Sequence, residues 1–120
     1  MNKASVHALS ATTLIGDKVV NSRGDELGKI HELMIDLASG RVAYAVLSFG
    51  GFLGVGDKLF AIPWSRLVVD TVQKCVVFDV TKDQLENADG FDKDDWPDFA
   101  EESFHTTTYG YWGETPYWAT

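Results

Sequence analysis

The sequence has little cysteine, little proline and no long hydrophobic run. It contains one cysteine, Cys75, and three prolines in 120 residues. A single cysteine excludes an internal disulfide framework and fits a reducing cytoplasm. No apolar run approaches the roughly 20 residues that cross a bilayer, and the N-terminal stretch lacks the sustained apolar segment of a secretory signal. We therefore expect a cytoplasmic protein that does not insert into membranes.

Positive charge is scarce in the last third of the chain. Residues 1–81 carry eight Lys/Arg and eight Asp/Glu, whereas residues 82–120 carry two Lys/Arg and ten Asp/Glu, so the net charge of −8 belongs to the C-terminal part. Binding of nucleic acids draws much of its affinity from cations that neutralise phosphates. The charge pattern therefore argues against a nucleic-acid partner and against an anionic membrane surface.

Short apolar segments between turn-forming residues predict an all-β body from Leu14 to Val80. The expected strands span residues 18–21, 29–36, 42–49, 58–62, 67–70 and 75–80. Residues 42–49 are apolar at consecutive positions, which predicts a strand covered on both faces. The imperfect alternation in residues 29–36 indicates either a bulge or a strand with two covered faces. So many short strands favour a closed or nearly closed barrel over a sheet with exposed edges.

A short helix is expected after the last strand, followed by a tail. Thr81 and Gln84 have the spacing of a capping box, and Leu85 and Ala88 would face the body. Beyond them lie nine of the fifteen aromatic residues but almost no aliphatic ones. With one domain expected at this length, we divide the chain into an N-terminal arm (1–13), a barrel (14–88) and an extended, acidic and aromatic tail (89–120) that packs on a barrel.

The ordered motifs of the body resemble the PRC-barrel family, a β-barrel shared by the H subunit of photosynthetic reaction centres and a ribosome-maturation factor. The motifs that carry the resemblance are Leu14-Ile15-Gly16, Gly24, Gly28-Lys29-Ile30, the turn at 36–40, Gly54-Val55-Gly56-Asp57 and Ile62-Pro63-Trp64. It covers residues 14–88, and the tail is similar to that of stand-alone bacterial members. The resemblance implies a small PRC-type β-barrel that acts as an adaptor for other macromolecules, without catalytic residues.

The residues themselves indicate no catalytic, cofactor or metal site. The glycine-rich stretch 50–56 is followed by Asp57, where a phosphate-binding loop needs lysine, so bound phosphate would be repelled. His7, His31 and His105 lack the spacing of a zinc site. The paired carboxylates of the tail have no walled pocket that would tune them as acid and base, which disfavours a hydrolase. The apolar residues of the glycine-rich stretch either fold back on the barrel or meet a partner.

Large aromatic side chains are costly to leave in water, since burying each is worth roughly 1.5–3 kcal/mol, and aromatics are enriched at interfaces. We therefore predict a non-catalytic interaction domain that forms a homo-oligomer, most simply a dimer, with another protein as a further possible partner. The expected interface residues are Phe52, Leu53, Val55, Trp96, Tyr111, Trp112, Tyr117 and Trp118. The alternative is a small-molecule-binding protein with a pocket at the barrel end, lined by Phe52, Tyr44 or Trp64.

Overall fold

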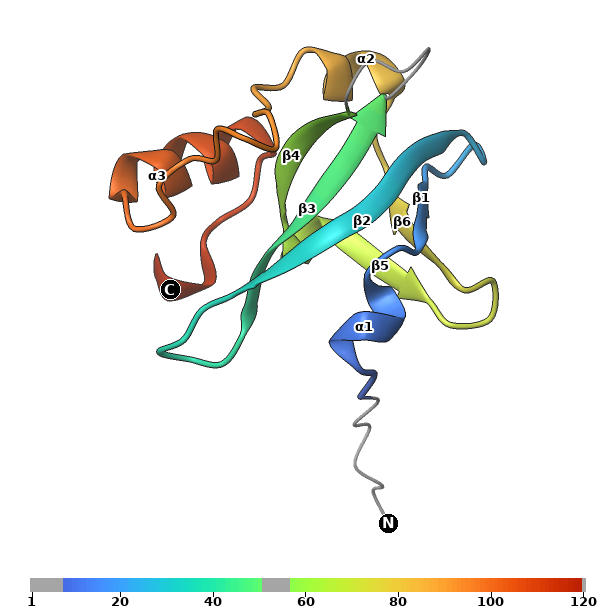
Figure 1. Cartoon of the computed structure of the whole chain (residues 1–120), viewed down its shortest axis with the longest axis horizontal. Coiled ribbons are helices and arrows are strands. Elements are labelled where there is room, and N and C mark those ends of the chain that lie inside the picture. Colours follow the sequence, from blue (N-terminus) through green and yellow to red (C-terminus); the bar gives the residue numbers. More distant parts are fainter. Residues whose placement is uncertain (1–7, 51–56, 120) are drawn as a thin grey trace.

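The computed structural model describes residues 8–50 and 57–119, which form a curled β-sheet with helices around it (Figure 1). The strands are β1 (Lys18–Val20), β2 (Glu26–Ile35), β3 (Val42–Gly50), β4 (Asp57–Pro63), β5 (Leu67–Asp70) and β6 (Cys75–Phe78). The α-helices are α1 (Ala11–Leu14), α2 (Lys82–Glu86) and α3 (Glu102–Tyr111). Short 3-10 turns occupy Trp64–Arg66 and Tyr117–Ala119. Every predicted strand is present, within a few residues at its ends.

The six strands lie in the order β4-β3-β2-β1-β6-β5. Neighbours are antiparallel except β1 and β6, which pair in parallel through Val19 with Val76 and Val20 with Val77. Strands β4 and β5 are the two edges, so the described sheet is a curled half-barrel, which is consistent with the predicted PRC-type β-barrel. Strands β5 and β6 are only four residues long, which leaves too little sheet to close against β4.

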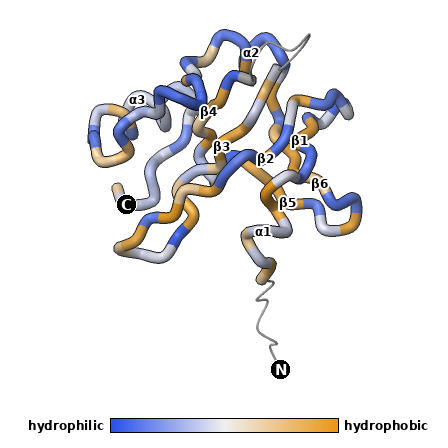
Figure 2. Tube along the Cα trace, in the orientation of Figure 1, coloured by the Kyte–Doolittle hydropathy of each residue, from blue (hydrophilic) through white to orange (hydrophobic). Residues whose placement is uncertain are grey.

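Hydrophobic residues cover both faces of β3, as its sequence predicts, and Figure 2 shows the strands carrying most of the hydrophobic stretches. Leu47 of β3 belongs to the inner core with Phe60, Phe78 and other side chains. Tyr44 belongs to a second cluster, which Phe99 and Phe104 of the tail cover. The sheet therefore has a core inside its curl and a second core beneath the tail.

Residue pairing along β2 is irregular, which confirms the predicted bulge. Against β3 the register shifts between Ile30 and Glu32 and again between Met34 and Ile35. A third shift, against β1, lies between Val19 and Val20, which pair with Gly28 and Glu26. Each shift adds twist to the strand, and together they let one ten-residue strand bend around the inner core.

The turn between β1 and β2 is tied to the end of β6. Gly24 has φ +85°, as expected for a glycine in this turn. Asn21 is buried, and its amide donates to Asp25 Oδ2 and to the carbonyl of Val80, both at 3.0 Å. The side-chain oxygen of Asn21, Oδ1, accepts the backbone N–H groups of Arg23 and Asp25. A fully bonded buried amide of this kind joins parts of the chain that lie 59 residues apart.

Helix α2 begins with the capping box indicated by the sequence, in which Thr81 and Gln84 bond reciprocally. Leu85 and Ala88 are buried against the inner core, as expected. The tail beyond them was expected to be extended, but residues 102–111 form helix α3. Three consecutive threonines and Gly110 are poor helix formers, so packing on the sheet, and not intrinsic propensity, stabilises this helix.

The tail also fills the open side of the half-barrel. Trp112 follows α3, is 6% exposed and packs edge-on against Phe78, with 5.1 Å between ring centroids. Arg66 donates to the Trp112 carbonyl at 2.5 Å and lies over the Phe78 ring. At the β4 edge, Phe91 and Leu59 exchange two backbone hydrogen bonds, at 2.8 and 2.9 Å. The tail thus covers surface that strands would cover in a closed barrel.

Candidate functional site

A cleft of about 380 Å³ lies where the tail meets the hairpin of β2 and β3. We call it the aromatic cleft, because five of its lining residues carry rings. These are Tyr44, Phe99, His105, Tyr117 and Trp118. Ile35, Asp36 and Leu37 of the hairpin form its opposite wall, with Met34 and Ala43 completing the lining. The sheet provides Tyr44, α3 provides His105, and the last residues of the tail bring in Tyr117 and Trp118.

A hydrogen-bonded pair anchors α3 to the sheet inside the cleft. The Tyr44 hydroxyl lies 2.6 Å from His105 Nδ1, and His105 Nε2 lies 2.7 Å from the Phe99 carbonyl. A carbonyl only accepts, so Nε2 carries the hydrogen and Nδ1 accepts from the Tyr44 hydroxyl. The two rings also stack, with an interplanar angle of 17°. Both polar ends of the imidazole are therefore already bonded within the chain.

A second contact fixes the end of the chain to the hairpin. The Tyr117 hydroxyl donates to Asp36 Oδ2 at 2.6 Å, and Ser39 Oγ donates to the same oxygen at 2.9 Å. These two bonds, with backbone bonds from Ala38 and Ser39, outweigh burial and hold the pKa of Asp36 below its usual value. Asp36 is therefore ionised at neutral pH and gives the cleft a negative charge.

Tyr117 separates the aromatic cleft from a second cleft of about 310 Å³, lined in part by Arg41, Trp64 and Tyr109. The Arg41 guanidinium lies over the Tyr117 ring, 4.9 Å from its centroid. Such a cation on an aromatic face is worth about 0.5–1 kcal/mol at an exposed position. Of the three residues expected to line a pocket, Tyr44 lines the aromatic cleft, Trp64 lines the second cleft, and Phe52 lies outside the described residues.

The predicted interface residues that the structure describes lie at several different places. Tyr117 and Trp118 stand together at the aromatic cleft, with ring centroids 4.9 Å apart. Trp96 lies against His31 of β2, and Tyr111 donates to the Gln84 carbonyl. Trp112 is buried in the inner core of its own chain, so it is not part of the exposed surface. Phe52, Leu53 and Val55 lie outside the described residues.

Sequence reasoning gave no functional role to Asp36, Leu37 or His105. The first two fall at a hairpin turn, and His105 was considered only as a metal ligand. One signal was available in the tail, since Phe104, His105, Thr108, Tyr109 and Trp112 follow the i, i+1, i+4, i+5, i+8 spacing of one helix face. This spacing identifies the side of α3 that meets the sheet.

The structure also bears on metal and membrane sites. Over residues 8–50 and 57–119, no three His, Cys, Asp or Glu side chains gather as possible ligands of a metal ion. No helix in the described part of the chain has the length and apolar character to cross a bilayer. Cys75 is half-buried at the start of β6 and carries a free thiol.

The fold and the cleft define a small half-barrel β domain with an aromatic-walled surface cleft. The PRC-barrel domain model matches residues 7–85, which is more than half of the chain. The chain therefore belongs to the PRC-barrel family, and the resemblance seen in the sequence is confirmed.

Other comparisons give a distant likeness. No curated protein matches the chain. A solved structure of a putative 16S ribosomal RNA processing protein, RimM, from Pseudomonas aeruginosa is 18% identical with a TM-score of 0.45. The likeness covers 69% of this chain and 50% of that chain, so the matched part is half of the other protein.

The buried tyrosines of this region predict weaker folding at alkaline pH. Burial, with smaller contributions from Tyr117 and Glu114, raises the pKa of Tyr109 to about 12, and burial raises that of Tyr44 as well. An unfolded tyrosine ionises near pH 10, so the unfolded state loses protons first. The stabilisation is complete below pH 10 and is lost as pH rises towards 12.

We therefore expect the free energy of unfolding, measured in urea, to fall between pH 10 and pH 12. In Tyr109→Phe the fall should be shallower, because one of the three tyrosines whose pKa is raised (Tyr44, Tyr109 and Tyr117) is gone. An unchanged pH dependence in this variant would contradict the conclusion that burial of Tyr109 contributes to the loss of stability at alkaline pH.

Proposed function

We propose that the chain is a non-catalytic protein-interaction domain of the cytoplasm that forms a homodimer. The supporting observation is a group of exposed apolar side chains at the mouth of the aromatic cleft, which we call the hairpin patch. It consists of Ile35, Leu37 and Trp118, which are 47%, 92% and 47% exposed. Other large apolar side chains of the described chain are also exposed, namely Leu9, Val68, Val72, Trp96 and Tyr111, but these three line one cleft together. Such a cluster favours a contact with another protein.

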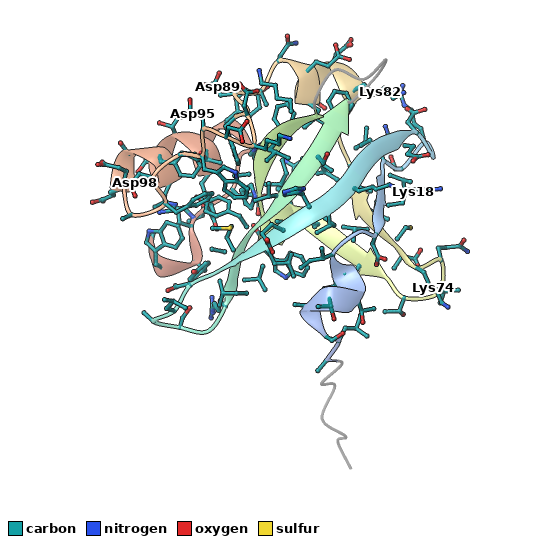
Figure 3. All side chains as sticks on the ribbon, viewed as in Figure 1. Lys18, Lys74, Lys82, Asp89, Asp95 and Asp98 are labelled. Atoms are coloured by element: carbon teal, nitrogen blue, oxygen red, sulfur yellow. The ribbon has the colours of Figure 1, made fainter. Side chains whose placement is uncertain are left out.

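Charge placement favours a second copy over a strongly charged partner at this patch. The labelled aspartates of Figure 3 lie on the side of α2 and α3, and Lys18 and Lys74 lie on the opposite side. The turn of the hairpin, residues 36–41, carries one acid, Asp36, and one base, Arg41. A dimer through the hairpin thus brings together surfaces that are close to neutral. Repulsion between the distant acidic regions is screened, since the Debye length is about 8 Å at physiological ionic strength.

Dimerisation through the hairpin patch predicts a specific sensitivity at Leu37. In Leu37→Ser we expect the dimer to dissociate at least about tenfold more readily, because a leucine side chain buried at the contact is worth roughly 1.5–3 kcal/mol. Sedimentation equilibrium measures the dissociation constant. Salt should strengthen the wild-type dimer by screening the acidic regions.

Val72→Ser is the matched control, since Val72 is 84% exposed at the turn between β5 and β6. It should leave the dimer unchanged. Equal effects of the two variants, or dissociation of the wild-type dimer by salt, would contradict a contact at the hairpin patch.

A second function, binding of a small molecule, is favoured by the aromatic cleft itself. Its volume of about 380 Å³ falls in the roughly 300–1,000 Å³ range of ligand sites. Tyr44 at its base is fully buried and held by His105, so that wall is formed in advance of binding.

A further inference from the structure

The walls of the aromatic cleft are rings that meet at steep angles. Trp118 stands at 86° to Tyr117 and at 76° to His105, with centroid separations of 4.9 and 5.4 Å. Phe99 meets the buried Tyr44 at 64°. Tyr44 and His105 are stacked, whereas the rings set at these steep angles form the sides of a box. Aromatic boxes are the surroundings in which proteins recognise quaternary ammonium groups.

The charge lining the cleft is negative. Asp36 is the carboxylate of its wall, and no Lys or Arg is among its lining residues. The positive side chain closest in sequence, Arg41, lies over the Tyr117 ring in the neighbouring cleft. The C-terminal part adds the net charge of −8. An anionic ligand would therefore be repelled, and a cation would be attracted.

The polar groups of the cleft are already engaged. The Tyr117 hydroxyl donates to Asp36, the Tyr44 hydroxyl donates to His105, and His105 donates to Phe99. Asp36 accepts four bonds, from the side chains of Tyr117 and Ser39 and from the backbones of Ala38 and Ser39. A carboxylate has about four acceptor sites, so Asp36 has more charge than hydrogen-bonding capacity left to offer. A ligand with several N–H donors would leave most of them unbonded.

We propose that the aromatic cleft binds a quaternary ammonium group carried on a short apolar stem. Such a cation has no N–H to satisfy, its methyl groups pack against rings, and its charge is balanced by Asp36. The stem would contact Met34 and Ala43 in the cleft wall. The inference rests on the cleft as a ligand site, the second function above, and the cleft shares Ile35, Leu37 and Trp118 with the hairpin patch.

The test is calorimetric titration of the full chain with choline and with its neutral isostere, 3,3-dimethylbutan-1-ol. We expect choline to bind at least about tenfold more tightly, because the two differ only in charge. Equal affinity would overturn the cation inference and leave the small-molecule function standing. If neither compound binds, the small-molecule function and the cation inference both fall.

Two variants test the position of the site. Asp36→Asn keeps the acceptor for Tyr117 but removes the charge, and should weaken choline binding about tenfold. Asp94→Asn removes one charge from an exposed position outside the cleft and should change affinity less than about twofold, because screening weakens distant charges. Similar losses in both variants would show a diffuse attraction and overturn the site.

A further titration, with peptides, distinguishes whether the ammonium group belongs to a modified protein or to a free small molecule. A five-residue alanine peptide with trimethyllysine at its centre is compared with the same peptide carrying unmodified lysine, and with choline. Tighter binding of the trimethyllysine peptide than of choline would assign the ligand to a modified protein. Tighter binding of choline would assign it to a free small molecule. Tighter binding of unmodified than of trimethylated lysine would contradict the requirement for a quaternary group.

Discussion

Replacing Trp112 with alanine should lower the free energy of unfolding by about 3–5 kcal/mol, the usual cost of removing a buried aromatic side chain. Trp112 is 6% exposed, although it belongs to the tail, and it packs against Phe78 inside the half-barrel. Its removal leaves a cavity in the inner core and takes away the ring that covers the open side of the sheet. Urea unfolding followed by circular dichroism measures the loss.

Trp118→Ala provides the comparison within the same tail. Trp118 is 47% exposed, so its removal should cost about 1 kcal/mol or less, as for most surface positions. Similar losses for the two tryptophans would mean that Trp112 has no special place in the core. A Trp112 variant with normal stability would contradict the packing of the tail on its own sheet.

Replacing Gly28 with alanine should be about as damaging, for a different reason. A Cβ atom at Gly28 would lie 2.0 Å from the carbonyl oxygen of Ser48 on β3, and Gly28 has φ +148°. Neither the backbone of β3 nor this dihedral angle accommodates a side chain without strain. Overpacking and backbone strain each cost roughly 1–3 kcal/mol, so we expect a loss of about 3 kcal/mol or more, or failure to fold.

Gly110→Ala is the matched control for this glycine. Gly110 lies within α3, and a Cβ atom there would meet nothing within 4 Å. Alanine is the better helix former, so this variant should gain roughly 0.5–1 kcal/mol. Thermal unfolding of the two variants and the wild type measures both changes in stability. Unchanged stability of Gly28→Ala would contradict the close approach of β2 and β3.

Local sequence signals predicted the parts of the fold that depend on neighbouring residues. Alternation and turn chemistry located the strands, Gly24 marked a turn, and Thr81 with Gln84 marked the start of α2. The degree of closure of the barrel was not predictable in the same way, because it depends on pairing across the whole sheet. The parallel contact of β1 with β6 joins segments more than fifty residues apart, and no local pattern specifies it.

The tail also shows that distant contacts can override local sequence signals. Its threonines and Gly110 have low helix propensity, yet α3 forms because Tyr109 packs on the sheet and donates to the Ala43 carbonyl at 3.0 Å. The aromatic residues were recognised as groups that must be covered. Which surface covers each ring was not predictable, since the pairing of Tyr44 with His105 spans 61 residues. The candidate site was therefore only partly visible, through Tyr44, Tyr117 and Trp118.

Native mass spectrometry of the freshly purified full chain tests the interaction-domain account most directly. At tens of micromolar protein we expect a species of twice the 13.3 kDa chain mass, and its loss in Leu37→Ser but not in Val72→Ser. The spectrum also reports any co-purifying small molecule. A wild-type protein that stays monomeric at all concentrations tested would contradict dimerisation through the hairpin patch.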